Sequence, residues 1–574
     1  MKSPRIERRP VANIAADWPE SVHPVLRRVY AARGILRPHE IQHRLASLLA
    51  PNLLGGIDRA CELIEGAIEN NERIVIVGDF DADGATGTAV AVRGLRMLGA
   101  RNVDYSVPNR FTHGYGLSVA LVNELTPLEP KLLITVDNGI VAHAGVREAR
   151  ARGMRVIVTD HHLPSADLPE ADAIVNPNVR GDEFPSKCVA GVGVMFYLLL
   201  ALRARLRERG RFAGQTEPDL STLLDLVALG TVADLVPLDH NNRILVEGGL
   251  RRMRAGRACA GINALLECAK RDVRRVVASD LGFAVAPRIN AAGRLEDMRI
   301  GIECLLTDDA SRARQLAETL TNINAERRDL QSVMVEQAEA AVSTWLSRDE
   351  ATLPCGVVLF DESWHHGIVG LVASRLKDKL QRPVIACAPS ENCDEIKASG
   401  RSIAGFHLRD ALAEIDARQP GLLRRFGGHA MAAGMTIHRD GLEILSRQFA
   451  DVARERIAPE LFDAIVLSDG ELCGDDFKLD LAEQLRSGGP WGQSFPEPLF
   501  DGTFINESWR VMGETHLRFN LRCGEFHAPL EAVMFNGYSG SAPPNRFRAA
   551  YSLDINEWNG ASKLRLLLRH VEAV

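Results

Sequence analysis

Three aspartates, Asp79, Asp81 and Asp83, stand at alternating positions directly after the apolar run 74–77. Three carboxylates this close together cannot all stay ionised without a positive counter-charge. A divalent cation is the usual counter-charge, and Mg²⁺ and Mn²⁺ prefer oxygen ligands of this kind. The segment therefore predicts a metal site, although an ordinary acidic turn in front of a helix fits the same few residues.

Two further apolar runs end in residues of the same kind. Residues 132–136 run into Asp137, and residues 155–159 run into the triplet Asp160-His161-His162. Helical patterns lie between the runs, so the runs are expected to be parallel strands of an α/β sheet. The carboxyl ends of parallel strands meet at one edge of the sheet, where such folds bind ligands. We therefore expect these side chains to converge.

A fourth contributor to that edge is Asp234, which ends the stretch 229–233. Carboxylates combined with one or two imidazoles suit a pair of Mn²⁺ or Mg²⁺ ions that share ligands, rather than zinc held by thiolates. A centre of this kind activates a water and stabilises both oxygens of an in-line phosphoryl displacement. The combined pattern indicates phosphoryl-transfer chemistry.

Length and composition limit the class of protein. A chain of 574 residues is expected to form three or four domains, and 46% apolar with 25% charged residues is typical of a soluble globular protein. No apolar run is long enough for a membrane span, and the charged N-terminus does not resemble a signal peptide. Ten scattered cysteines without a CxxC pair favour reduced thiols and a cytoplasmic location.

Charge is distributed unevenly along the chain. The whole chain has a net charge of −7, which gives no general indication of nucleic-acid binding. Residues 251–294, however, hold ten Arg or Lys and only three acidic residues. Such a segment is compatible with a polyanion track, and a solvated surface is the alternative.

The ordered motifs resemble those of the DHH phosphoesterase superfamily. The segments 77–84, 136–139 and 230–234 and the triplet Asp160-His161-His162 are similar to its four motifs, and residues 426–434 resemble the Gly-Gly-His signature of the associated DHHA1 domain. The resemblance runs from about residue 55 to the C-terminus. It implies a parallel-sheet DHH domain joined by a long helix to a smaller α/β DHHA1 domain, followed by a C-terminal OB-like β-barrel.

The resemblance also implies an activity, which is Mn²⁺- or Mg²⁺-dependent removal of nucleotides from the 5′ end of single-stranded DNA in repair and recombination. It assigns the metal ligands as Asp79, Asp81, Asp137, His161 and Asp234, with Asp137 or Asp81 bridging two ions. His162 would face the scissile phosphate or support a ligand. Asp83 would be a supporting carboxylate, and Asp160 would orient His161.

One position departs from the superfamily pattern. Many members have a histidine four residues before the first aspartate of the metal loop, and Val75 occupies that position here. The departure implies that one ion has fewer protein ligands, more water and weaker affinity.

Substrate contacts are implied at several further residues. The arginines Arg288 and Arg294 suit phosphate oxygens, because a guanidinium offers a fork of donors. Ser399 and Arg401 lie in a segment with the composition of a phosphate pocket, which in the resembling family receives the 5′-phosphate. The set of expected substrate-binding residues is Arg110, Arg288, Arg294, Ser399, Arg401, Gly428 and His429.

Five regions are expected along the chain. They are an N-terminal helical extension at 1–56, the DHH domain at 57–308, a long connecting helix at 309–348, the DHHA1 domain at 349–459 and an OB-fold nucleic-acid-binding domain at 460–574. The helical pattern 309–345 lacks Pro and Gly, and five or six short strands after 500 suit an OB barrel. A capping barrel without a DNA role is the alternative for the last region.

Two rival functions remain open at this level. One is a phosphodiesterase for cyclic dinucleotides or short oligonucleotides, for which the arginine-rich segment and the barrel would be unnecessary. The other is a non-catalytic scaffold that binds single strands, which would require broken metal motifs. The expected partners are single-stranded DNA, a single-strand-binding protein and a RecQ-type helicase, with no membrane.

Overall fold

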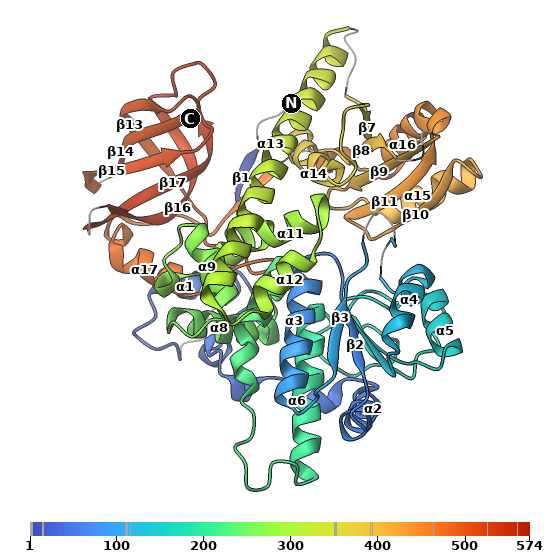
Figure 1. The fold of residues 1–574 in the computed structure, drawn as a ribbon. Coiled ribbons are helices and arrows are strands. Elements are labelled where there is room, and N and C mark those ends of the chain that lie inside the picture. The colour runs from blue at the N-terminus through green and yellow to red at the C-terminus, as the bar shows by residue number, and fades with distance from the viewer. Residues whose placement is uncertain are drawn as a thin grey trace.

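The computed structural model describes residues 4–13, 17–109, 113–114, 116–348, 353–390, 392, 394–462, 464–524, 526–558 and 561–574. Two α/β lobes, a long helix and a β-barrel make up the molecule (Figure 1). Among the described helices, none is long and apolar enough to cross a membrane.

The first lobe contains a parallel sheet of five strands in the order β3-β2-β4-β5-β6. Its strands are β2 Ile74–Val77, β3 Val103–Ser106, β4 Leu132–Val136, β5 Arg155–Thr159 and β6 Ala173–Val175. The two central strands β2 and β4 are buried along their whole length, because both faces of the sheet are covered by helices. The expected parallel α/β sheet is thereby confirmed.

Helices cover both faces of this sheet. α3 (Ala82–Met97) and α6 (Gly191–Glu208) pack together on one face, while α4 (Val119–Leu125) and α5 (His143–Ala151) form a smaller apolar core on the other. The register aligns Val77 with Thr135. It also aligns Val136 with Thr159. The residues that follow β2, β4 and β5 are therefore neighbours.

A helical layer completes the first lobe. Its members are α2 Ile57–Glu69, α7 Leu224–Ala233, α8 His240–Arg254, α9 Ala260–Cys268, α10 Ala278–Asp280, a π-helical turn Leu281–Val285, α11 Ala286–Leu295 and α12 Arg299–Leu306. The helices α7, α11 and α12 pack on α3, so they lie next to the segment that follows β2.

One long helix connects the lobes. α13 spans Ala310–Arg348, which is 39 residues and about 58 Å at 1.5 Å per residue. It packs on α9, α11 and α12 of the first lobe and on α14 of the second (Figure 1). The expected connecting helix is confirmed.

The second lobe is a mixed five-stranded sheet with three helices. Its strand order is β10-β11-β9-β8-β7, and only β7 and β8 pair in parallel. The elements are β7 Val357–Phe360, α14 Val369–Leu380, β8 Val384–Pro389, β9 Glu395–Arg401, α15 Leu408–Arg418, β10 Leu423–Gly428, β11 Ala432–His438 and α16 Leu442–Arg456.

The C-terminal part is a closed five-stranded barrel in the order β13-β14-β15-β17-β16. Its strands are β13 Phe500–Met512, β14 His516–Cys523, β15 Phe526–Met534, β16 Arg546–Trp558 and β17 Ala561–Ala573, and α17 Leu479–Ser487 precedes them. These strands are longer than the short ones expected after residue 500. β13 runs continuously from 500 to 512, because a bulge between Asn506 and Ser508 bends the strand without ending it.

The N-terminal segment is attached to the barrel end of the chain. β1 (Arg5–Arg8) pairs in parallel with β12 (Ile465–Ser468), and α1 (Pro24–Ala31) follows it. The guanidinium of Arg33 donates to Asp469 at 2.7 Å, and both side chains are 1% exposed. The segment that we expected to be purely helical therefore also contains a strand, which holds the two ends of the chain together.

Candidate metal centre and nucleic-acid groove

The loop after β2 presents its aspartates at the start of α3. The carboxylate of Asp81 caps the helix by accepting the amide of Gly84 at 3.0 Å, and Asp79 accepts the amide of Phe80 at 2.7 Å. From the neighbouring helix α11, the side-chain oxygen of Asn290 accepts the amide of Ala82 at 2.8 Å. Short-range backbone contacts therefore fix both carboxylates before any ligand binds.

Asp137 follows β4 in a strained backbone conformation. Its φ is 64°, in the left-handed region that non-glycine residues rarely adopt, and its side chain is 2% exposed. Gly191 at the start of α6 lies directly against it, since a Cβ built at Gly191 would come within 2.5 Å of the Asp137 Cβ. The helix and the strand end thus position one carboxylate between them.

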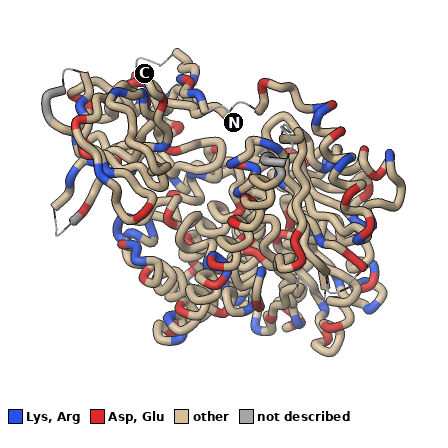
Figure 2. Tube along the Cα trace, turned by 90° about the horizontal axis from the view of Figure 1, so that it is seen from above, with Lys and Arg blue, Asp and Glu red and all other residues tan. Residues whose placement is uncertain are grey.

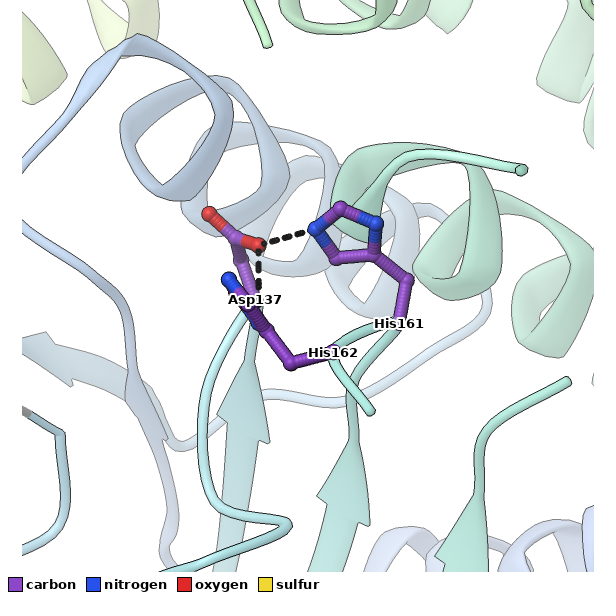
Figure 3. Close-up of side chains that lie close together, drawn as sticks. All are labelled: Asp137, His161 and His162. Atoms are coloured by element: carbon purple, nitrogen blue, oxygen red, sulfur yellow. Dashed lines mark ion pairs between the residues drawn. The ribbon is translucent and has the colours of Figure 1, made fainter. Parts of the chain in front are cut away.

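The two histidines after β5 reach the same carboxylate. His161 Nε2 lies 3.1 Å from Asp137 Oδ1 and 3.4 Å from Asp234 Oδ2, so Asp234 at the end of α7 joins the cluster. His162 Nδ1 lies 4.0 Å from Asp137 Oδ1 (Figure 3). The edge predicted from the strand ends is therefore assembled from β2, β4, β5 and α7.

The carboxylate of Asp160 differs from what we expected. Its Oδ1 lies 2.7 Å from His162 Nδ1, and it accepts the backbone amides of both histidines. The ring that it orients is therefore that of His162, whereas the superfamily resemblance assigned it to His161. The other oxygen of Asp160 accepts the amide of Ile140 at 2.9 Å, which fixes the carboxylate from the segment after β4.

Asp83 is bound by the protein itself. Its two carboxylate oxygens accept the amides of Gly191 and Val192 at 2.7 and 2.9 Å, at the start of α6. A carboxylate is stabilised there by the helix dipole and by amides that have no partner within the helix. The arrangement is compatible with the supporting role expected for Asp83.

The cluster suits divalent cations. Ligand atoms of Asp79, Asp81 and Asp137 lie within 4.8 Å of one another, as do those of Asp137, His161 and His162 and those of Asp83, His161 and Asp234. Burial, and then the charges of the neighbouring aspartates, raise the pKa of Asp83 to about 7 and the pKa of Asp137 and of Asp234 well above its usual value. A bound cation would remove this repulsion, so the donor set fits the expected Mn²⁺ or Mg²⁺.

The two neighbouring imidazoles differ in protonation. Burial, together with the charge of His162, lowers the pKa of His161 to about 4, so its ring is neutral and can act as a ligand. Burial also lowers the pKa of His162, but the hydrogen bond and the charge of Asp160 outweigh it and raise the value to about 9. One histidine is therefore suited to a cation and the other to an anion.

Residues of the second lobe approach this centre. The ring of His429, just after β10, stacks on that of His162 with 6.1 Å between centroids. Gly428 has a φ of 142°, and a Cβ there would come within 2.4 Å of the Ala432 carbonyl oxygen. The turn that carries His429 to the first lobe therefore requires glycine at 428.

Ser399 and Arg401 lie next to each other at the start of α14. Arg401 Nη1 donates to Ser399 Oγ at 3.0 Å, and both side chains face Gly370, where a Cβ would come within 2.9 Å of each. A hydroxyl, a guanidinium and a helix N-terminus together are suited to an anion. The structure therefore brings together the two residues that the sequence marked as a phosphate pocket.

A groove of about 1120 Å³ lies between α11, α13, α14 and the barrel. Six cations line it against two acids, Glu336 and Glu339, and Thr515 and Asn536 of the barrel close its far end. Figure 2 shows positive and negative residues interspersed over the whole trace, so this excess is local. The cations are Arg288, Arg294, Arg327, Arg328, Arg375 and Lys379.

Two of the three arginines expected to bind the substrate lie in this groove. Arg288 and Arg294 both line the groove; Arg288 donates to Thr321 Oγ1 at 3.1 Å, and Arg294 donates to the Gly367 carbonyl oxygen at 3.2 Å. Arg110 lies outside the described residues. Sequence reasoning missed Arg327, Arg328 and Arg375, whose only signal was their position on α13 and α14 among ordinary surface charges.

Family models match three parts of the chain. The model described as DHH family, N-terminal domain matches residues 73–231, the DHHA1 domain matches 353–457, and the RecJ OB domain matches 468–570. The matches follow the first lobe, the second lobe and the barrel in that order.

Close relatives match along their whole length. The single-stranded-DNA-specific exonuclease RecJ of Dickeya dadantii is 49% identical, with 99% of each chain covered, and that of Escherichia coli is 47% identical, with 98% of each covered. Crystal structures of Thermus thermophilus RecJ in complex with Mn²⁺ and with Mg²⁺ align with TM-scores of 0.80 and 0.75, at 32% and 30% identity, over 96% of this chain and 76% and 75% of theirs. The chain belongs to the RecJ family.

Proposed function

We propose that this chain is a metal-dependent exonuclease that degrades single-stranded DNA from the 5′ end. One observation carries the proposal. Asn290 borders both parts of the machinery, because it accepts the amide of Ala82 in the metal loop and also lines the basic groove. A strand lying in the groove would therefore pass directly into the metal centre.

The residues that would hold two Mn²⁺ or Mg²⁺ ions are Asp79, Asp81, Asp137, His161 and Asp234, with Asp83 and Asp160 in support. When bound, such ions activate a water and neutralise charge on the oxygens of the displaced phosphate. Asp160 fixes the ring of His162 at the same edge. We assign His162 to the scissile phosphate and His429, stacked on it, to the adjoining backbone.

The groove supports a polynucleotide rather than a small substrate. Burial, followed by the charges of Arg328 and Arg375, lowers the pKa of Arg327, and burial with Arg328 lowers that of Arg288. Guanidiniums that repel one another in this way gain from a row of phosphates between them. A cyclic dinucleotide would need neither this row of cations nor the barrel residues Thr515 and Asn536 that line the same groove.

The 5′ polarity follows from the pocket at the start of α14. A terminal phosphate can use the Arg401 guanidinium, the Ser399 hydroxyl and the helix N-terminus together, whereas an internal phosphodiester carries less charge. We assign this pocket to the 5′-phosphate. We assign Arg288 and Arg294 to the backbone of the strand, and Gly428 to its close approach.

Further assignments rest on the family and on the free thiols. Single-stranded DNA is the proposed partner, together with a single-strand-binding protein and a RecQ-type helicase in repair and recombination. Every described cysteine is free, which supports a cytoplasmic location. The five regions proposed from the sequence, with boundaries near 56, 308, 348 and 459, are compatible with the family matches.

A labelled-strand assay tests the function. The full chain is incubated with 5′- or 3′-labelled single strands and with a duplex, in Mn²⁺, Mg²⁺ or EDTA. We expect immediate release of mononucleotides from the 5′ label, gradual shortening of the 3′-labelled strand, and no cleavage of the duplex or in EDTA. Early release of the 3′ label, or cleavage in EDTA, would contradict the proposal.

A further inference from the structure

Phe283 is the most exposed large apolar side chain among the residues that the structure describes, with 82% of its surface accessible. It lines the groove between α11, α13 and α14, together with the arginines described above. An aromatic ring held in water beside a row of cations loses the stabilisation that burial would give it. A ligand that has both an apolar face and negative charge would therefore fit this position.

The backbone around Phe283 is built to hold the ring outward. Leu281, Ala284 and Val285 of the same π-helical turn are buried, and Gly282 packs against Val232 of α7. Arg288, one turn farther along the chain, donates from its guanidinium to the Ala284 carbonyl oxygen. Single π-turns inside helices occur frequently at functional sites, because they shift the direction of the side chains that follow.

Two further guanidiniums line the same groove. Arg328 and Arg375 are exposed there, on α13 and α14. Neither forms an ion pair with a carboxylate in the part of the chain that the structure describes. Lys379, farther along α14, pairs with Glu339 at 2.7 Å. The groove thus contains an aromatic ring from the turn before α11 and guanidiniums on α13 and α14 that form no ion pair among the described residues.

We propose that Phe283 stacks on a base of the single strand, with the phosphates turned toward Arg328 and Arg375. The proposal rests on the proposed function and names a residue that orients the strand within it. Stacking on an aromatic ring tolerates any sequence, because every base has a π-face. It also requires an unpaired base, so Phe283 would favour single strands over duplexes at this point of the groove.

The test combines a variant that lacks the Phe283 ring with DNA strands that lack one base. Binding of the full chain in EDTA is measured for single strands in which one position at a time is abasic. For the unchanged protein we expect one position, or two adjacent ones, to weaken binding about 5- to 100-fold. Phe283→Leu should weaken binding of the intact strand by a similar factor. In that variant, removing the base at the sensitive position should not weaken binding any further. Phe283→Trp should keep both the affinity and the abasic penalty.

Val333→Ala provides the control, because Val333 is 54% exposed on α13 but does not line the groove. It should leave affinity and the abasic profile unchanged. If Phe283→Leu retains the full abasic penalty, the ring does not contact a base and the inference is wrong. If the unchanged protein fails to bind single strands at all, the proposed function itself fails, and the two results are distinguishable.

Discussion

The metal centre and the groove are built in opposite ways. Every carboxylate of the centre follows a strand, begins a helix or ends one, and backbone amides hold four of them in place, Asp79, Asp81, Asp83 and Asp160. The groove is lined by side chains of α11, α13, α14 and the barrel, which are far apart in the chain. Its exposed arginines have long flexible side chains and few fixed contacts.

This difference suits the two regions to two tasks, catalysis at the centre and strand binding in the groove. A centre in which a 1 Å displacement matters needs short, rigid connections, because catalysis depends on the placement of reacting atoms. A track for a polyanion needs only enough positive charge along its length. We therefore expect substitutions at the centre to abolish cleavage and leave binding, and substitutions in the groove to weaken binding by small steps.

The largest effect is expected from Asp137→Ala. Loss of this carboxylate removes a ligand of the proposed two-ion centre, so cleavage should fall by on the order of 10³ or more, while single-strand binding and the fold remain. The measurement is the initial rate at saturating Mn²⁺ together with affinity in EDTA. A variant that keeps more than about a tenth of the rate would remove Asp137 from the centre.

Gly191→Ala should come next, although residue 191 has no side chain of its own. Its new Cβ would lie 2.5 Å from the Asp137 Cβ, so the carboxylate must move. A displacement of this size is expected to lower the rate about 100-fold. Gly66→Ala is the matched control, since a Cβ at that helical glycine meets nothing within 4 Å. Equal rates for the two variants would contradict the rigid placement of Asp137.

Arg401→Ala tests whether Arg401 binds the terminal phosphate or the backbone of the strand. If Arg401 holds the terminal phosphate, the variant should lose the preference for 5′-phosphorylated over 5′-hydroxyl ends, by a factor corresponding to about 1.5–3 kcal/mol. The measurement is kcat/KM for the two kinds of end. Equal losses on both ends would place Arg401 on the general backbone track instead.

The smallest effect is expected from Arg328→Ala in the groove. Removing one phosphate contact should weaken single-strand binding a few-fold and reduce the slope of log affinity against log salt by about 0.7. Arg257→Ala serves as the control, because Arg257 is exposed but lines no part of the groove. A slope that is the same in both variants would show that the strand does not follow α13.

The convergence of the acidic and histidine side chains at one edge could be predicted from the sequence, because the information for it is local. Strands, helix starts and acidic turns are visible as short patterns, and parallel pairing then brings Asp79, Asp137 and His161 to one edge. The partner of Asp160 could not be predicted, because a neighbouring triplet does not reveal which ring turns toward the carboxylate. The continuous strand β13 was also missed, since a bulge has no clear pattern in sequence.

Arg288 and Arg294, which the sequence marks as substrate contacts, line the groove. The part of the groove on α13 and α14 and the N-terminal contacts could not be predicted, because they depend on long-range packing. Arg328 and Arg375 have the sequence surroundings of any solvated helix face. Likewise, β1 is four residues long and pairs with β12 more than 450 residues later. Phe283 stands in the apolar stretch 281–286, and only its 82% exposure separates it from the buried positions beside it.

We propose that the edge formed by β2, β4, β5 and α7 holds the ions that cleavage requires. Equilibrium binding of Mn²⁺ to the full chain, measured by calorimetry beside the cleavage rate, tests it most directly. We predict two ions per chain, the second weaker because Val75 supplies no imidazole, and loss of both binding and cleavage in Asp137→Ala. Unchanged stoichiometry in that variant, or full cleavage without bound metal, would contradict the account.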